Sequence, residues 1–265
     1  MPELAEVAYA CKTWRPGLGM EVSQAICHPK SRVFRDLDQD TLARFLSGAT
    51  LRSSQSHGKQ MLFGFSTGWL GLHLGMTGSL TLEDAGYEPA KHDALVLKQS
   101  QQTLVFNDPR QFGKLTWDDC GEVPGWWANL PPLMTSPEFS IDLLGTALSK
   151  HKRQPIKALL LDQRYFPGMG NWMADEVLWR AGIHPAQLAG QIPPKGQKSL
   201  YGQAVFVAQG VMDTVGKRGG DPPDDWLFHA RWKDGQTCPK SGITLVREKI
   251  GGRTTCWSPT LQPIP

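Results

Sequence analysis

The chain begins Met1-Pro2-Glu3, and a proline in second place can supply a catalytic amine. Because proline is small, we expect Met1 to be removed, which leaves a secondary amine on a rigid ring. Such an amine can attack an aldehyde-level carbon, such as C1′ of a nucleotide, and form an iminium, as lysine amines do in Schiff-base enzymes. Pro2 is therefore a candidate nucleophile.

The segment after Glu3 has the spacing of an amphipathic helix, with apolar side chains at Leu4, Val7 and Cys11. We expect Pro2 and Glu3 in the first turn of this helix, where the positive end of the helix dipole disfavours a protonated amine. Proline is also common at the start of helices that have no catalytic role. Its position alone therefore leaves both interpretations open.

Two kinds of pattern follow along the chain. Residues 20–117 contain short apolar segments separated by turn signals, at 60–65, 70–74, 94–97 and 104–106, which predict a β-sandwich or barrel. Proline-rich residues 118–137 indicate a linker, and residues 138–216 have a helical pattern.

Within the helical part, Gly168 and Gly170 interrupt the pattern, and a second helix is predicted to open with Asn171 as its N-cap. Free N–H groups at such a helix start can face a phosphate, although an ordinary helix–loop–helix corner has the same pattern. Residues 244–257 predict a β-hairpin that turns at Gly251-Gly252, with Arg253 just past the turn.

Charge is distributed unevenly over the 265 residues. Residues 1–149 carry 12 Lys and Arg against 16 Asp and Glu, whereas residues 150–265 carry 16 against 9. A basic C-terminal half is typical of proteins that bind a polyanion such as nucleic acid. The odd number of scattered cysteines argues against a disulfide framework and favours a reducing cytoplasm. No apolar run is long enough to suggest a signal peptide or a membrane span.

Five motifs occur in an order that resembles the formamidopyrimidine-DNA glycosylase / endonuclease VIII family of base-excision repair enzymes. They are Pro-Glu-Leu at 2–4, His-Gly-Lys at 57–59, His-Leu-Gly-Met-Thr-Gly-Ser-Leu at 73–80, Asp-Pro-Arg-Gln-Phe-Gly at 108–113 and Gly-Met-Gly-Asn-Trp-Met-Ala-Asp-Glu-Val-Leu at 168–178. The resemblance runs nearly end to end. It implies an α+β, two-domain protein, with an N-terminal helix and β-sandwich and a C-terminal helix–two-turn–helix domain, that holds DNA between its domains.

The domain boundaries expected from this resemblance divide the chain into four parts. They are a catalytic β-sandwich domain at 1–120, a linker at 121–137, a helix–two-turn–helix DNA-binding domain at 138–230 and a finger hairpin at 231–265.

The resemblance also implies roles for nine residues. Pro2 would attack C1′ of a damaged nucleotide that has been flipped out of the duplex, and Glu3 would shuttle protons. Lys59 would be a catalytic cation near the phosphate and sugar of the lesion. The expected DNA contacts are His73, Met76, Arg110, Phe112, Asn171 and Arg253.

Three of these contacts match the residues with which formamidopyrimidine glycosylases fill the gap left by the flipped nucleotide. A thioether at Met76 and a ring at Phe112 can replace lost stacking, and the guanidinium of Arg110 can hydrogen-bond the orphaned base. Ordinary core packing is the alternative for Met76 and Phe112. In the same way, Lys59 could be a solvated turn lysine and His73 a core histidine.

The C-terminal region departs from the family. Many bacterial members carry a four-cysteine zinc finger, and a structural zinc site normally needs four ligands. Here the four positions are Cys238, Ser241, Ser258 and Leu261. We therefore expect no metal and a zincless finger, held by packing of residues such as Leu245, Ile250 and Trp257.

Two smaller departures are Ala5, where proline is usual in the family, and Gln111, where a second arginine is common. Residues 216–228 stand in the place of a lesion-covering loop and match no substrate pattern.

The leading prediction is a bifunctional DNA glycosylase and AP lyase that excises formamidopyrimidine or 8-oxoguanine lesions with β,δ-elimination. One alternative is an endonuclease VIII-like enzyme that prefers oxidised pyrimidines, and another is an inactive DNA-damage-binding protein. The expected partner is double-stranded DNA with damaged bases or abasic sites. We expect no cofactor, no membrane partner, a monomer, and use on bacterial DNA in the cytoplasm.

Overall fold

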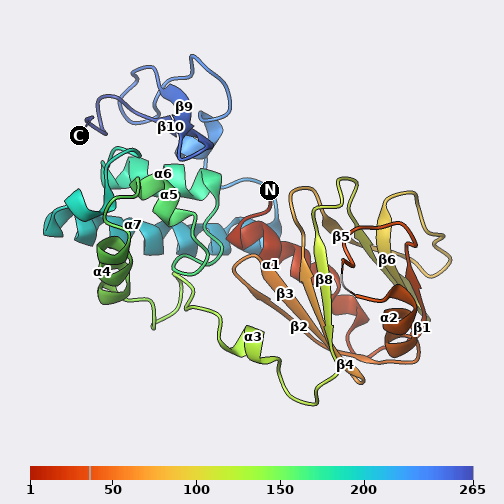
Figure 1. Cartoon of the computed structure of the whole chain (residues 1–265). Coiled ribbons are helices and arrows are strands. Elements are labelled where there is room, and N and C mark those ends of the chain that lie inside the picture. The colour runs from red at the N-terminus through yellow and green to blue at the C-terminus, as the bar shows by residue number, and fades with distance from the viewer. Residues whose placement is uncertain (36, 265) are drawn as a thin grey trace. The chain divides into compact units, whose positions relative to one another are not determined.

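The computed structural model describes residues 1–35 and 37–264, and the chain divides into two compact units (Figure 1). The first unit contains residues 1–2 and 6–130, and the second contains residues 3–5 together with the chain from Pro131 onward. The division falls inside the segment 121–137 that the sequence indicates as a linker. This segment also contains a short helix, α3 (Gly125–Ala128).

The bounds of the other elements are as follows. The helices are α1 (Leu4–Thr13), α2 (Gln39–Leu46), α4 (Ile141–Lys150), α5 (Ile156–Leu160), α6 (Asn171–Ala181), α7 (Pro194–Asp213) and α8 (Val215–Arg218), with 3-10 turns at Arg15–Gly17, Ala189–Gln191 and Leu227–His229. The strands are β1 (Val22–Cys27), β2 (Leu51–His57), β3 (Gln60–Phe65), β4 (Gly68–His73), β5 (Ser79–Asp84), β6 (Asp93–Gln99), β7 (Gln102–Asn107), β8 (Lys114–Asp118), β9 (Val246–Ile250) and β10 (Arg253–Trp257).

The first unit is a β-sandwich of two antiparallel sheets. One sheet has the strand order β2-β3-β4-β8, and the other has the order β1-β6-β7-β5. Its core takes side chains from both sheets, among them Phe63 and Leu72 from the first and Leu97 and Phe106 from the second. The strands predicted near 60–65, 70–74, 94–97 and 104–106 correspond to β3, β4, β6 and β7, so the sandwich prediction is confirmed.

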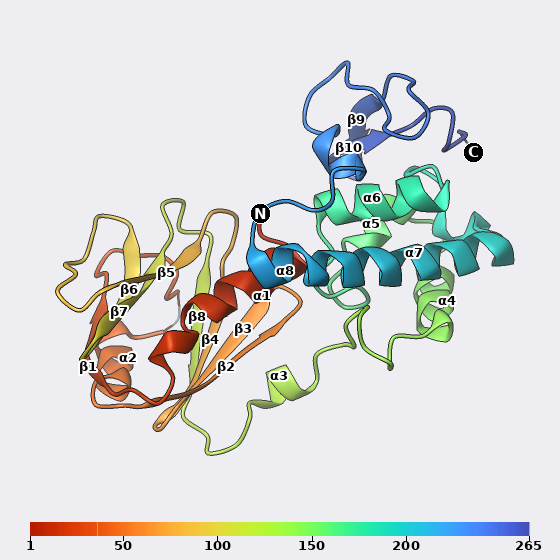
Figure 2. The same cartoon turned by 180° about the vertical axis from the view of Figure 1, so that it is seen from behind.

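The second unit is helical. Its core lies among α4, α5, α6 and the 20-residue helix α7, which Figure 2 shows along its length. Gly182 ends α6 in the left-handed conformation with φ 69°, as the sequence predicts for a glycine at a helix C-terminus.

The predicted hairpin is also present in this unit. Strands β9 and β10 pair in register with Ile250 opposite Arg253, and the glycines between them, Gly251 and Gly252, have φ values of 59° and 77°. Two consecutive positive φ values favour glycine and produce the tight turn that suits a hairpin. The hairpin packs beside α6 (Figure 2).

The N-terminal helix differs in one respect from the sequence prediction. Helix α1 begins at Leu4, so Pro2 and Glu3 precede it and do not lie in its first turn. The reason is that Leu4 donates its N–H to the carbonyl of Gly168, and the chain before it stays non-helical. Among residues 1–35 and 37–264, no helix is long and apolar enough to cross a membrane.

Candidate functional site

The carboxylate of Glu3 lies at the N-terminus of helix α6, although the two are far apart in the sequence. Its Oε1 accepts the backbone N–H of Trp172, and its Oε2 accepts the N–H of Met173, both at 3.1 Å. Glu3 is only 2% exposed. The N–H groups at a helix start have no partner within the helix and attract negative charge. Two of the groups that the sequence suggested for a phosphate therefore bind Glu3.

Gly170 makes room for this arrangement. A Cβ atom at this position would overlap the carboxyl group of Glu3. The backbone of Gly170 has φ −124° and ψ −167°, which any residue can adopt. The glycine is therefore required by the close approach of Glu3 and not by its own conformation.

The prediction that Asn171 is the N-cap of this helix is wrong. Gly170 occupies the cap position and Asn171 is the first helical residue. Because Glu3 satisfies the first N–H groups, the Asn171 side chain is free to bond elsewhere. Its Nδ2 donates to the backbone carbonyl of Thr254 in β10 at 2.8 Å. An amide nitrogen has two hydrogens, so one remains for a phosphate oxygen.

In the first unit, Pro2 is partly exposed and directly precedes the buried Glu3. Lys59 follows the turn between β2 and β3, where Gly58 has φ 60°. The Lys59 residue is only 9% exposed, which is inconsistent with a solvated turn lysine.

His73 ends strand β4 and has a defined orientation. Its Nδ1 accepts the backbone N–H of Gly75 at 3.0 Å, so in the neutral ring the proton is on Nε2, where it can be donated to an anion. Burial lowers the pKa of His73, and the positive charges of Lys59 and Arg35 lower it further.

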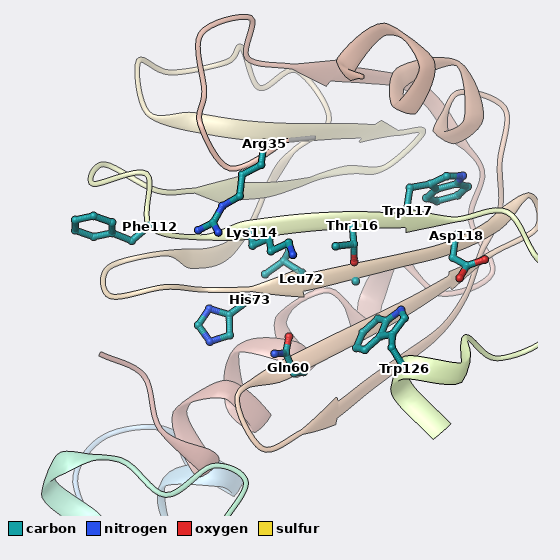
Figure 3. Close-up of a pocket in the computed structure, with 11 residues that line it drawn as sticks. Arg35, Gln60, Leu72, His73, Phe112, Lys114, Thr116, Trp117, Asp118 and Trp126 are labelled. Atoms are coloured by element: carbon teal, nitrogen blue, oxygen red, sulfur yellow. The ribbon is translucent and has the colours of Figure 1, made fainter. Parts of the chain in front are cut away.

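His73 lines a pocket of about 640 Å³ in the first unit. Figure 3 shows Arg35, His73, Lys114 and Gln60 toward one end of this pocket and Trp126 toward the other. A cluster of Arg, Lys and His around one opening is suited to bind the phosphates of a nucleic acid. The histidine is therefore part of a polar pocket and not a core residue.

Met76 and Phe112 do not pack in the core. Met76 is 41% exposed and Phe112 is 49% exposed, and the guanidinium of Arg110 lies 5.0 Å from the centroid of the Phe112 ring. A Cβ atom at Gly75 would overlap the backbone of Phe112, so the loops that carry these residues touch. Core packing, the alternative interpretation of Met76 and Phe112, is excluded.

Asp108 connects these two loops. Its Oδ1 accepts the hydroxyl of Thr77 at 3.2 Å, and its Oδ2 accepts the N–H of Gly113 at 2.7 Å. Gln111 has a left-handed backbone with φ 56°, and its side chain accepts the N–H of Arg32. The three exposed side chains are thus carried by loops with a fixed backbone.

Arg253 is exposed at the start of β10, immediately after the hairpin turn. Through the bond from Asn171 to Thr254, the start of α6 is tied to the residue next to Arg253. The second unit therefore brings Glu3, Asn171 and Arg253 to the region around the start of α6.

The residues at the four finger positions do not fit a zinc ion. The hydroxyls of Ser241 and Ser258 each lie within hydrogen-bond distance of Thr260 Oγ1, at 3.2 and 3.1 Å. The sulfur of Cys238 accepts the indole N–H of Trp179, and Leu261 packs against the same apolar cluster. Serine hydroxyls and a leucine are not ordinary zinc ligands. In the described part of the chain, no group of three His, Cys, Asp or Glu residues could hold a metal.

Sequence reasoning missed a buried charged cluster in the second unit. Asp175 lies on α6, where it pairs with Lys157 of α5 and with Arg231, and these three residues are 1%, 0% and 5% exposed. Burial lowers the pKa of Lys157, and Asp175 opposes this effect. The available signal was Lys157, the charged residue in the otherwise apolar helix α5, since such a residue is buried only when it is paired.

Two family models match the chain. The model of the formamidopyrimidine-DNA glycosylase N-terminal domain matches residues 1–115, and the formamidopyrimidine-DNA glycosylase H2TH domain model matches residues 130–217. Among curated relatives, a formamidopyrimidine-DNA glycosylase of Geotalea daltonii is 33% identical over 99% of this chain and 100% of its own length. The enzyme of that name from an Exiguobacterium strain is 30% identical and is covered to 99%.

Solved structures agree with these matches. The Lactococcus lactis Fpg (MutM) in complex with DNA that contains an oxidised pyrimidine has a TM-score of 0.89 and 26% identity, with 99% of this chain and 100% of that chain covered. A MutM structure in complex with DNA that contains carbocyclic 8-oxo-G has a TM-score of 0.88, 26% identity and the same coverage.

Proposed function

The chain belongs to the formamidopyrimidine-DNA glycosylase family, and we propose that it excises oxidised bases from double-stranded DNA and cleaves the resulting abasic site, with Pro2 as the nucleophile. The single observation that carries the assignment of the site is the placement of Glu3. Glu3 follows Pro2 in the chain, and its buried carboxylate is oriented by two backbone N–H groups at the start of α6.

In the first step, the lone pair of the Pro2 nitrogen attacks C1′ of the damaged nucleotide, and the bond between C1′ and the base breaks with its electrons going to the base, which takes up a proton from water. The attached nitrogen gives its own proton to the carboxylate of Glu3. Glu3 delivers this proton to O4′ as the sugar ring opens, which leaves an iminium between Pro2 and C1′ and an ionised Glu3. Water or Glu3 then takes a proton from C2′, which expels the 3′ phosphate, and loss of a second proton from C4′ to water expels the 5′ phosphate. Water finally releases the sugar fragment and regenerates the amine.

The hydrogen bonds of Glu3 are compatible with this proton transfer. Each carboxylate oxygen has more than one lone pair, so accepting an N–H of α6 does not by itself prevent it from holding a proton. The helix N-terminus favours the ionised form that the iminium needs beside it.

The DNA would be held by cations and helix termini. The phosphates around the lesion would be contacted by four side chains, those of Lys59, His73, Asn171 and Arg253. Phosphate contacts of this kind position the duplex without reading its sequence.

A separate group of side chains would act inside the duplex. Met76, Arg110 and Phe112, which are exposed on adjoining loops, would fill the gap left by the flipped nucleotide. Their exposure supports this role because a wedge must be free to enter the base stack.

The lesion class is proposed to be the formamidopyrimidine and 8-oxoguanine type, on the basis of this trio. An oxidised-pyrimidine preference is the second candidate, and one observation favours it. The similar L. lactis protein has been solved with DNA that contains an oxidised pyrimidine. Excision assays on duplexes with 8-oxoguanine, formamidopyrimidine and thymine glycol would rank the two.

The decisive experiment is borohydride trapping on an abasic-site duplex. The wild-type protein, with removal of Met1 verified by intact-mass spectrometry, is expected to form a covalent adduct because borohydride reduces the iminium. Pro2→Gly is expected to lose most of this adduct. Glu3→Gln is the matched control, since it keeps the amine and removes the proton carrier.

Two outcomes would contradict the proposal. A processed wild-type protein that binds the duplex but forms no adduct would support the alternative of an inactive damage-binding protein. An adduct that survives Pro2→Gly unchanged would place the nucleophile elsewhere. We also propose that the protein acts as a monomer in the bacterial cytoplasm, which light scattering with and without DNA and cell fractionation would test.

A further inference from the structure

The hairpin β9–β10 is joined to α6 at two points with matching spacing. Asn171 Nδ2 donates to the carbonyl of Thr254 at 2.8 Å, and the N–H of Cys256 donates to Asp175 Oδ2 at 3.1 Å. Four residues along a helix rise about 6 Å, and two residues along a strand rise about 6.8 Å. Two polar side chains one turn apart on α6, Asn171 and Asp175, therefore face two residues of β10 that are two positions apart, Thr254 and Cys256.

Asp175 is the centre of this junction. Its Oδ1 accepts the ammonium of Lys157 at 2.5 Å, and its Oδ2 accepts Arg231 Nη2 at 2.6 Å and Nε at 3.1 Å. The Lys157 ammonium also donates to the backbone carbonyl of Asn171. One carboxylate thus connects α5, α6, the segment that precedes the hairpin and strand β10, and all three charged residues are buried.

The turn of the hairpin is fixed by the residue that follows Lys157. A Cβ atom at Gly251 would lie 2.9 Å from the Cβ of Ala158, so the turn rests directly on α5. Arg253 comes two residues later and is exposed. The same helix that supplies Lys157 therefore supports the turn from which Arg253 projects.

A hairpin of this size needs such support. A two-stranded hairpin is at best marginally stable alone in water, and the finger positions here do not fit a metal. The buried apolar side chains of this region are Ile250 and Trp257 of the hairpin, together with the cluster of Trp179, Leu227, Cys238, Leu245 and Cys256. Buried charges that have lost a partner are strongly unfavourable, so a broken pair would release the segment that depends on it.

We propose that Asp175 is a positioning residue, whose buried contacts with Lys157, Arg231 and the Cys256 amide hold the hairpin on α6 and thereby hold Arg253 in place to reach a DNA phosphate. The part of the proposal that concerns DNA rests on the function proposed above, whereas the part that concerns the hairpin does not.

The first test measures hydrogen exchange in the full chain without DNA. Asp175→Asn keeps the shape of the side chain and removes its charge. Backbone amides of residues 246–257 are expected to exchange at least about tenfold faster, since the hairpin opens more readily without its charge-assisted hydrogen bonds. Amides of α7 are expected to be unchanged. The matched control is Asp213→Asn, which removes the same charge from an exposed pair with Lys217.

The second test asks whether Asp175 acts through Arg253. Affinity for an abasic-site duplex is measured as a function of salt for Asp175→Asn, Arg253→Ala and the double variant. A plot of log affinity against log salt has a negative slope. Each single variant is expected to make this slope shallower by about 0.9, the value for one lost phosphate contact. The double variant is expected to be no worse than either single one, because both remove the same contact.

Several results would overturn the proposal. Unchanged hairpin exchange in Asp175→Asn would remove its basis, and additive losses in the double variant would show that Asp175 does not act through Arg253. If Asp175→Asn fails to fold, Arg231→Gln repeats both tests while it retains the Lys157–Asp175 pair. Global unfolding of both variants would mean that the network supports the whole unit and does not position the hairpin. Failure of the wild type to trap DNA would refute the proposed function alone and leave the exchange result standing.

Discussion

The α-carbon of Gly170 lies so close to the carboxyl group of Glu3 that a methyl group there would overlap it. This contact joins the residue after the candidate nucleophile to the start of α6. It also explains why the chain has glycine at a helix cap position where Ser, Thr, Asn or Asp would normally be preferred. The N–H groups of Trp172 and Met173 are capped by the carboxylate of Glu3, which lies about 170 positions earlier in the chain.

Gly170→Ala is therefore expected to displace Glu3 while the amine of Pro2 is retained. Overpacking at such a contact typically costs about 1–3 kcal/mol of unfolding free energy. We expect a lower melting temperature and a large loss in the rate of borohydride trapping on an abasic-site duplex.

The control for this variant is Gly145→Ala in the middle of α4, where a Cβ meets open space. There the substitution should stabilise the helix by up to about 1 kcal/mol and leave trapping unchanged. A Gly170→Ala protein that traps DNA as fast as the wild type would show that the position of Glu3 is not important for the chemistry.

Because the side chains of Met76 and Phe112 are exposed, their replacement should affect activity but not stability. Because both are substantially exposed, replacement by alanine should change the unfolding free energy by no more than about 0.5 kcal/mol. Excision of a damaged base should fall, since stacking of a base on an aromatic ring is worth about 1–3 kcal/mol. Melting curves and single-turnover excision rates measure the two effects separately.

Leu82→Ala provides the comparison, because Leu82 is an exposed apolar residue on β5 of the same unit. It should affect neither stability nor excision. Equal losses of activity in Phe112→Ala and Leu82→Ala would argue against a wedge.

Local patterns predicted much of this molecule. Short apolar segments bounded by turn signals located β3 and β7, and the Gly251-Gly252 pair located the hairpin turn, because strands and tight turns depend on residues close in sequence. The motif order led to the two-domain family fold, which the family models confirm. These features needed no knowledge of distant contacts.

The contacts that organise the site could not be predicted in this way. Glu3 bonds to a helix that begins 168 positions later in the chain, and neither segment carries a local signal of the other. The assignment of Asn171 as the N-cap failed for this reason, since a remote carboxylate had taken the cap role. The ion-pair partner of Asp175 was equally hidden, because Arg231 lies 56 positions later in the chain.

The pKa of His73 predicts a pH dependence of DNA binding. Burial, with Lys59 and Arg35, lowers this pKa below the usual 6.5, so the free protein has a neutral ring near pH 7. A bound phosphate favours the protonated ring and raises the pKa, so binding takes up a proton. Affinity for an abasic-site duplex should therefore rise as the pH falls from about 7.5 toward 6. Fluorescence anisotropy at constant ionic strength measures this.

His73→Gln should flatten the pH profile of DNA affinity, whereas His28→Gln, just after β1, should leave it unchanged. The folding stability of the protein without DNA should depend on pH in the opposite direction from its DNA affinity. Because the folded-state pKa is lowered, the unfolded chain binds the proton more readily, so the stability that neutral His73 contributes is complete above pH about 6.5 and declines as the pH falls below it. An identical pH profile in His73→Gln would exclude a phosphate contact at this residue.

The last prediction concerns metal. Ser241 and Ser258 share hydrogen bonds with Thr260, and Leu261 packs in an apolar cluster, so the finger should need no zinc. Elemental analysis should find far less than one zinc per chain, and a chelator should change neither the melting temperature nor the hydrogen exchange of residues 246–257. A triple variant tests the same point from the other side. It combines Ser241→Cys, Ser258→Cys and Leu261→Cys, so that four thiolates are present with the native Cys238. This variant should gain a zinc ion and become sensitive to chelator, because a structural zinc site contributes folding free energy only when its four ligands are present. Stoichiometric zinc in the wild type, lost together with hairpin protection on chelation, would contradict the metal-free finger.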